Sequence, residues 1–185
     1  MTVLAAGLMV FLGVHLLPAS VTLRAAAIAR LGEHGYRGVF SLLALAGLVL
    51  IVLGMARAPF EAVYSAPAWG RHAAMAVMPV ALILLAGPSM PSNIKRYARH
   101  PMLWGVLLWS AAHLLANGDR AALLLFGSFA VYAVVDMVLA NRRGAILSTA
   151  VYPPRKDLMV VGGGLIAYGA LLFLHPYLFG VSVLR

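Results

Sequence analysis

The sequence predicts an all-α integral membrane protein, a polytopic bundle of about six transmembrane helices. Of its 185 residues, 63% are hydrophobic and only 10% are charged. A soluble domain carries roughly 45–50% apolar and about 25% charged residues, so these few charges would not cover a water-exposed surface. Apolar runs of about 20 residues recur along the chain, and this length crosses a hydrocarbon core of about 30 Å.

These runs predict six spans. They are Val3–Leu23, Val39–Ala56, Ala68–Ala86, Pro101–Ala116, Ala121–Ala140 and Leu158–Val181. Pro18 and Pro79 lie inside the first and third spans and predict a kink in each, because proline removes a helix hydrogen bond. No connection is long or polar enough to be a second domain, so residues 1–185 are expected to form a single integral membrane domain.

The charges predict how the chain is oriented. Nothing before Arg24 is basic, so the first span lacks the charged start of a signal peptide and is expected to be retained. The loops at 24–38, 87–100 and 141–157 hold three, three and four of the 14 Lys and Arg residues. Positively charged loops face the cytoplasm. In a bacterium this predicts a multi-pass inner-membrane protein with both termini periplasmic.

Composition also excludes several classes of function. The chain has no cysteine, which excludes disulfides, thiolate metal sites, iron–sulfur clusters and cysteine nucleophiles. A net charge of +9 would suggest nucleic acid in a soluble protein, but here the basic residues lie in short loops between spans. The expected partner is therefore the lipid bilayer, and no nucleic acid is expected.

Two histidines are placed inside the predicted spans. His15 lies 12 residues into the first span, and His113 lies 12 residues after Pro101. Each is therefore about 18 Å from its own starting face, and because the two helices run in opposite directions, both lie near mid-depth. Ionisable groups at this depth are costly and mark functional sites. Two imidazoles at matched depth suit the axial positions of a heme iron, although a His–Met pair would also serve.

The first and fourth spans repeat one pattern of Gly, aromatic residue and His, four residues apart: Gly7, Phe11 and His15, then Gly105, Trp109 and His113. Each set shares one helix face. Glycine would let a flat macrocycle approach the backbone, and the aromatic ring would pack against it. The alternative is that these residues mediate helix packing and that the histidines form hydrogen bonds between helices.

The remaining ionisable residues near the membrane have ordinary interpretations. Asp136 lies one turn from the cytoplasmic end of the fifth span, where it would pair with Arg142 or Arg143. The functional alternative for Asp136 is a proton relay or a substrate contact. His72 and His175 lie near the outer interface, and His34 is expected in a solvated loop. His100 precedes Pro101 at the start of the fourth span.

The fourth span carries a family resemblance. The run Arg99-His100-Pro101-Met102-Leu103-Trp104-Gly105, with Leu108-Trp109, Ala112-His113-Leu114 and Ala116-Asn117-Gly118-Asp119, resembles the central motif of the NnrU family. Upstream, His15, Leu23-Arg24, Tyr36-Arg37 and Phe40-Ser41 agree with it. NnrU proteins are bacterial membrane proteins associated with denitrification and named for a link to nitrite and nitric oxide reductase.

The NnrU family is similar to the plant zeta-carotene isomerase, which holds heme b between membrane histidines and isomerises a polyene double bond. One of its ligands lies early in the chain, and the other lies 13 residues beyond the His of an Arg-His-Pro motif, positions that His15 and His113 match. The resemblance implies heme b on these two ligands, with propionates near Arg24 or Arg99. It also implies a redox-gated isomerase with a lipophilic, lipid-phase substrate.

Two other functions stay open. The pattern R-H-P-x-x-x-G also resembles the cofactor motif of membrane methyltransferases that use S-adenosylmethionine, in which Arg99 and His100 would bind the cofactor. Those enzymes usually carry a later acidic pair, whereas residues 141–147 here contain no Glu. The third possibility is a non-catalytic assembly factor for reductase maturation.

Overall fold

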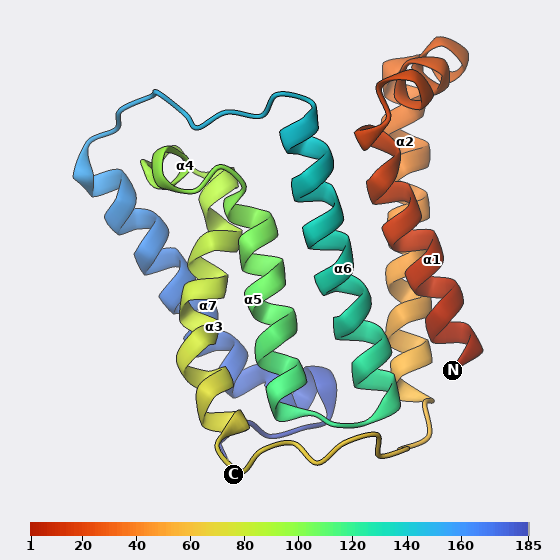
Figure 1. Cartoon of the computed structure of the whole chain (residues 1–185), viewed down its shortest axis with the longest axis vertical. Helices are drawn as coiled ribbons and strands as arrows, with labels where there is room; N and C mark the ends of the chain where they lie inside the picture. Colours follow the sequence, from red (N-terminus) through yellow and green to blue (C-terminus); the bar gives the residue numbers. More distant parts are fainter. Residues whose placement is uncertain (185) are drawn as a thin grey trace. The chain divides into compact units, whose positions relative to one another are not determined.

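The computed structural model describes residues 1–184, which are mainly helical and include no strand (Figure 1). The helices are α1 (Thr2–Leu16), α2 (Val21–Ala56), α3 (Gly70–Ala86), α4 (Ile94–Tyr97), α5 (Pro101–Ala116), α6 (Arg120–Arg142) and α7 (Pro154–Phe179), with short 3-10 turns η1 (Leu17–Ala19) and η2 (Gly87–Ser89). Contacts divide the chain into two compact units. The first comprises residues 1–65 and 118–140, and the second comprises 66–117 and the chain from 141 onward.

The helices confirm the predicted class. Within residues 1–184, five of them are long and apolar enough to cross a membrane, and α5, with 16 residues, is a shorter apolar helix. Large apolar side chains face outward, for example Leu42 at 68% and Ile166 at 75% exposure. Such a surface suits hydrocarbon better than water. The protein is therefore an α-helical membrane protein of about six spans, while the single membrane domain stays a prediction.

Close packing of α1 against α2 forms the core of the first unit (Figure 1). A Cβ on Gly7 would lie 2.6 Å from the Ile51 nitrogen, and a Cβ on Gly47 would lie 2.8 Å from the Phe11 nitrogen. Small residues allow this approach in lipid, where helices associate mainly through van der Waals contact. The packing holds the end of α1, which carries His15, in place within the first unit.

The first span ends earlier than predicted. α1 stops at Leu16, and Pro18 lies in the 3-10 turn that follows, so this proline ends the helix instead of kinking one that reaches Leu23. The Ser20 hydroxyl oxygen then accepts a hydrogen bond from the Leu23 N–H at 3.3 Å. This bond caps the start of α2, where the first N–H groups have no partner within the helix.

The loop predicted at 24–38 is wrong, because most of this segment is helical. Its basic residues interrupt the apolar pattern, but they do not prevent a helix from forming. Gly32 breaks α2 with φ 69° and ψ 165°, a conformation that residues with a side chain rarely adopt. Residues 21–31 and 33–56 are therefore two helices joined at a glycine, and the second contains the apolar span.

The start of α6 is anchored by the connection that follows α2. The Gly118 carbonyl accepts hydrogen bonds from the N–H groups of Val63 and Tyr64, at 2.8 and 3.1 Å. Arg120 pairs with Glu61 at 2.8 Å. The Asp119 carboxylate accepts from the N–H groups of residues 121 and 122, both at 3.0 Å, and so caps α6.

In the second unit α3 packs against both α5 and α7. The approach to α5 occurs at Gly105, where a Cβ would lie 2.8 Å from the Ala81 carbonyl oxygen. The approach to α7 occurs at Gly164, where a Cβ would lie 2.8 Å from the Ile83 Cα. Both glycines are buried, so α3 is the central helix on which the other two rest.

A buried asparagine fastens the connection at 141–157 within this unit. The backbone N–H and the Nδ2 of Asn93 donate to the two carboxylate oxygens of Asp157, each at 2.7 Å. Asn93 Nδ2 also donates to the Tyr152 carbonyl at 2.8 Å, and Asn93 Oδ1 accepts from the Tyr152 N–H at 2.9 Å. Because Asp157 lies in the first turn of α7, these bonds fix where that helix begins.

α3 runs without interruption through Pro79. Proline has no N–H, so Pro79 cannot donate to the carbonyl of Met75, four residues earlier. Tyr168 of α7 supplies a donor, since its hydroxyl lies 2.9 Å from the Met75 carbonyl oxygen. A neighbouring helix thus satisfies the carbonyl that the proline leaves open, which is the condition for proline inside a membrane helix.

Tyr168→Phe is expected to destabilise the detergent-solubilised protein by about 1–3 kcal/mol, because it removes the donor to a carbonyl at membrane depth. In a Pro79→Ala background the N–H of residue 79 returns, and the same substitution should then cost much less. Thermal unfolding of the four proteins gives the coupling as a double-mutant cycle. Equal costs in the two backgrounds would contradict this account.

Candidate functional site

His15 lies in the last turn of α1, among three aromatic rings of the first unit. Its ring centroid lies 4.2 Å from that of Phe11, 5.2 Å from that of Phe40 and 6.4 Å from that of Tyr132. The side chain is half-buried, and its Nδ1 lies 2.6 Å from the Phe11 carbonyl oxygen. Because a carbonyl only accepts, Nδ1 carries the proton and the lone pair is on Nε2.

His113 repeats this geometry in the second unit, in the last turn of α5. Its Nδ1 lies 2.8 Å from the Trp109 carbonyl oxygen, and the two ring centroids are 5.2 Å apart. The backbone carbonyl of His113 accepts from both the N–H and the Nδ2 of Asn117, each at 2.9 Å. Asn117 thereby ends α5 one turn after the histidine, whose lone pair is again on Nε2.

The two candidate ligands therefore share one tautomer. An Nδ1–H bound to a backbone carbonyl fixes the ring and makes Nε2 a better ligand, an arrangement common among metal-binding histidines. His100 has the opposite tautomer, because its Nε2 lies 2.9 Å from Asn141 Oδ1 and must donate. His175 resembles the pair, with Nδ1 2.7 Å from the Val181 carbonyl oxygen.

The Arg-His-Pro segment forms a corner at the start of α5. Arg99 Nη1 and His100 Nε2 both donate to Asn141 Oδ1, at 2.9 Å each. Pro101 then takes the first helical position, where its missing N–H costs nothing. Arg99 and His100 stay predicted cofactor residues, and the structure adds their contact with Asn141, a partner that sequence reasoning missed.

The glycines of the repeated pattern both serve helix packing. Gly7 meets α2, and Gly105 meets α3 at Ala81 and Leu85. This is the alternative that the sequence left open for these two positions. The aromatic residues of the pattern, in contrast, lie directly against the histidine rings.

Asp136 lies next to a residue that sequence reasoning missed. The hydroxyl of Tyr132, one turn earlier on α6, lies 3.4 Å from Asp136 Oδ2, which is long for a hydrogen bond of this type. Tyr132 also meets the His15 ring, so imidazole, phenol and carboxylate follow one another within the first unit. The spacing of four residues between Tyr132 and Asp136 was the available signal. The ion pair with Arg142 or Arg143 stays a prediction.

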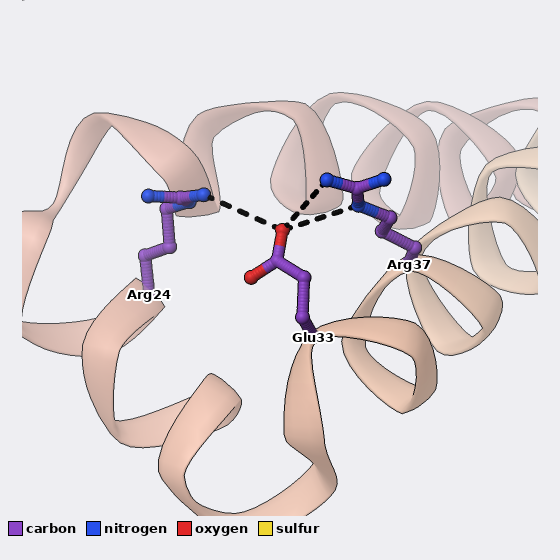
Figure 2. Close-up of polar contacts among 3 residues, drawn as sticks. All are labelled: Arg24, Glu33 and Arg37. Atoms are coloured by element: carbon purple, nitrogen blue, oxygen red, sulfur yellow. Dashed lines mark hydrogen bonds and ion pairs between the residues drawn. The ribbon is translucent and has the colours of Figure 1, made fainter.

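A groove of about 340 Å³ opens beside the break in α2. It is lined by Pro18, Arg24, Tyr36, Arg37, Phe40 and Ser41, and we call it the Arg24 groove. At its edge Glu33 Oε1 lies between two guanidinium groups, 3.9 Å from Arg24 and 3.0 Å from Arg37 (Figure 2). Phe40 faces both this groove and His15.

Within residues 1–184, no group of three or more His, Asp or Glu side chains is arranged to hold a metal ion. A heme iron takes its four equatorial ligands from the porphyrin and needs only axial ligands from the protein. His15 and His113 each offer one Nε2 lone pair, the kind of donor that an axial heme position takes.

Residues 3–183 match the sequence model of the NnrU family, whose description is NnrU protein. The chain belongs to the NnrU family. The NnrU match extends over both units, and it includes His15, His113 and the Arg99-His100-Pro101 corner. No curated protein and no solved structure matches the chain.

The tautomers can be measured by ¹⁵N NMR of heme-free protein labelled at histidine, at about pH 8, where imidazoles are neutral. We expect protonated Nδ1 in His15 and His113, because each donates to a carbonyl, and protonated Nε2 in His100. Single His→Gln variants assign the signals. Protonated Nε2 in either His15 or His113 would contradict the shared tautomer.

Proposed function

We propose that this NnrU protein is a bacterial inner-membrane heme b protein, with His15 and His113 as the axial ligands. The observation that supports it most directly is the shared tautomer, in which a carbonyl holds Nδ1–H and the lone pair is on Nε2. The sequence places the two residues at similar depth in their predicted spans; in the structure each lies in the last turn of its own helix, and each belongs to a different unit. The rings of Phe11 and Trp109 lie beside the histidines and would pack against the porphyrin.

Bound heme would supply a redox-active iron, and the protein residues prepare the ligands. The bonds from Nδ1 to the carbonyls of Phe11 and Trp109 keep each imidazole oriented. Phe11, Phe40 and Tyr132 limit the access of water to His15. Tyr132 and Asp136 add a hydroxyl and a carboxylate to the same cluster.

The expected substrate is lipophilic. Both histidines lie on apolar helices, and the connections are too short to build a soluble domain, so a substrate reaches the site from the lipid phase. The reaction class that the family resemblance favours is a redox-gated isomerisation, for which heme held by His15 and His113 would supply the redox-active iron. The family's association with denitrification links this function to nitrite and nitric oxide metabolism.

Purified protein from cells with ample heme is expected to show a Soret band that shifts on reduction. His15→Ala and His113→Ala should each abolish the spectrum of a six-coordinate heme, because each removes one axial ligand. His34→Ala, on the exposed part of α2, is the matched control and should leave the spectrum unchanged.

Colourless protein would reject heme binding. Unchanged spectra in both His15→Ala and His113→Ala would support heme binding but reject these two residues as ligands. Loss of the spectrum in His175→Ala would instead assign His175 as a ligand. If the protein is colourless and calorimetry shows S-adenosylmethionine binding that depends on Arg99 and His100, the methyltransferase alternative holds. An assembly factor would instead show neither cofactor and would co-purify with a partner.

The proposed orientation, with both termini periplasmic, follows from the basic segments at 24–38, 87–100 and 141–157. Alkaline phosphatase fused to the C-terminus is expected to be active, because this enzyme matures only in the periplasm. The same enzyme fused after Arg143 should be inactive. The reverse pattern of activities would invert the topology.

A further inference from the structure

We propose that the Arg24 groove binds the anionic head of an amphiphile, with Arg24 as the main cation. A carboxylate or phosphate would bind Arg24, and the first part of its apolar body would lie along Tyr36 and Phe40. The groove lies wholly within the first unit, so only the heme source of the anion rests on the proposed function.

The break at Gly32 creates the groove. Arg24 and Glu33 are nine residues apart, which is about 13.5 Å along an unbroken helix. In the structure Arg24 Nη2 lies 3.9 Å from Glu33 Oε1, because the chain changes direction at Gly32. Figure 2 shows Arg24 and Arg37 reaching the same carboxylate from opposite sides. The turn thus concentrates two cations around one anion.

The two arginines are not equally committed to Glu33. Arg37 contacts Glu33 Oε1 through both Nε, at 3.1 Å, and Nη2, at 3.0 Å. Arg24 lies beyond hydrogen-bond distance from the same oxygen, and its guanidinium carbon lies 5.9 Å from the Tyr36 ring centroid. One carboxylate cannot neutralise two guanidinium groups, so the cluster keeps a charge of +1. Arg24 is the group whose planar donors suit a second anion.

The remaining walls suit an apolar body attached to that anion. Pro18, Tyr36 and Phe40 present apolar surface, and the Ser41 hydroxyl adds one polar group. A volume of about 340 Å³ is at the small end of ligand pockets. It holds a head group and the start of its apolar part, and the rest of the molecule would lie in the bilayer.

Two sources provide this chemistry: the phosphate of an anionic phospholipid and a propionate of the proposed heme. The phospholipid source follows from the exposure of the cluster, since the side chains of Arg24 and Arg37 are 48% and 69% exposed. The propionate source follows from Phe40, which lines the groove and lies 5.2 Å from the His15 ring. One experiment with two arms distinguishes them.

The first arm uses heme-free protein and native mass spectrometry to count retained phosphatidylglycerol. If phospholipid is the ligand, Arg24→Gln should lower retention about five-fold, the effect of one basic residue near an anionic lipid. Arg30→Gln is the matched control, because it removes the same charge from the same short helix outside the groove. Glu33→Gln should raise retention, whereas it would lower it if Arg24 acted only through its ion pair with Glu33.

The second arm titrates the protein with heme and with heme dimethyl ester, whose propionates are neutral, and reads binding by absorbance. If propionate is the ligand, wild-type protein should bind heme more tightly than the ester, and Arg24→Gln should remove that difference. Arg24→Gln that behaves like Arg30→Gln in both arms would overturn the proposal. If the protein binds no heme at all, the proposed function is rejected, and phosphatidylglycerol retention alone then tests whether the Arg24 groove binds an anion.

Discussion

Every backbone carbonyl at membrane depth needs a donor, since hydrocarbon offers none. This requirement explains why Tyr168 donates to Met75 across two helices, where Pro79 cannot. It also explains why Asn117 donates twice to the His113 carbonyl as α5 ends. Helix carbonyls also accept from side chains: the Nδ1–H groups of His15 and His113 each donate to the carbonyl four residues earlier. Because the proton is on Nδ1 in both residues, the lone pair available to a ligand is on Nε2.

Several residues of the NnrU motif form hydrogen bonds that hold the ends of helices. Arg99 and His100 meet Asn141, and Asn117 closes α5. Gly118 and Asp119 then start α6 by accepting hydrogen bonds from neighbouring N–H groups, as described above. The motif residues around His113 therefore hold the end of α5 and the start of α6. In a family motif of a membrane protein, the residues that hold helix ends must be separated from the rest before any residue is assigned to catalysis.

Composition predicted the class, and apolar run length predicted most spans, because hydrocarbon thickness fixes helix length. α5 has the predicted bounds, Pro101 to Ala116, since proline starts it and Asn117 ends it. The helical segment at 21–31 was missed, because charge marks the membrane boundary without distinguishing a loop from a helix lying there. The only sequence signal for the break in α2 was the presence of a glycine, Gly32, among polar residues. The contacts of His15 with Phe40 and Tyr132 join distant segments, which periodicity along one helix cannot reveal.

The shortness of α5 has a consequence for the bilayer around it. Its 16 residues extend about 24 Å, against a hydrocarbon core of about 30 Å. A short helix is accommodated by local thinning of the bilayer or by flanking groups that reach outward. His113 lies three residues before the end of this helix, so the headgroup region comes closer to it than a full-length span would allow. Hydrophobic mismatch thus gives small polar molecules a shorter path to a histidine on an otherwise apolar helix.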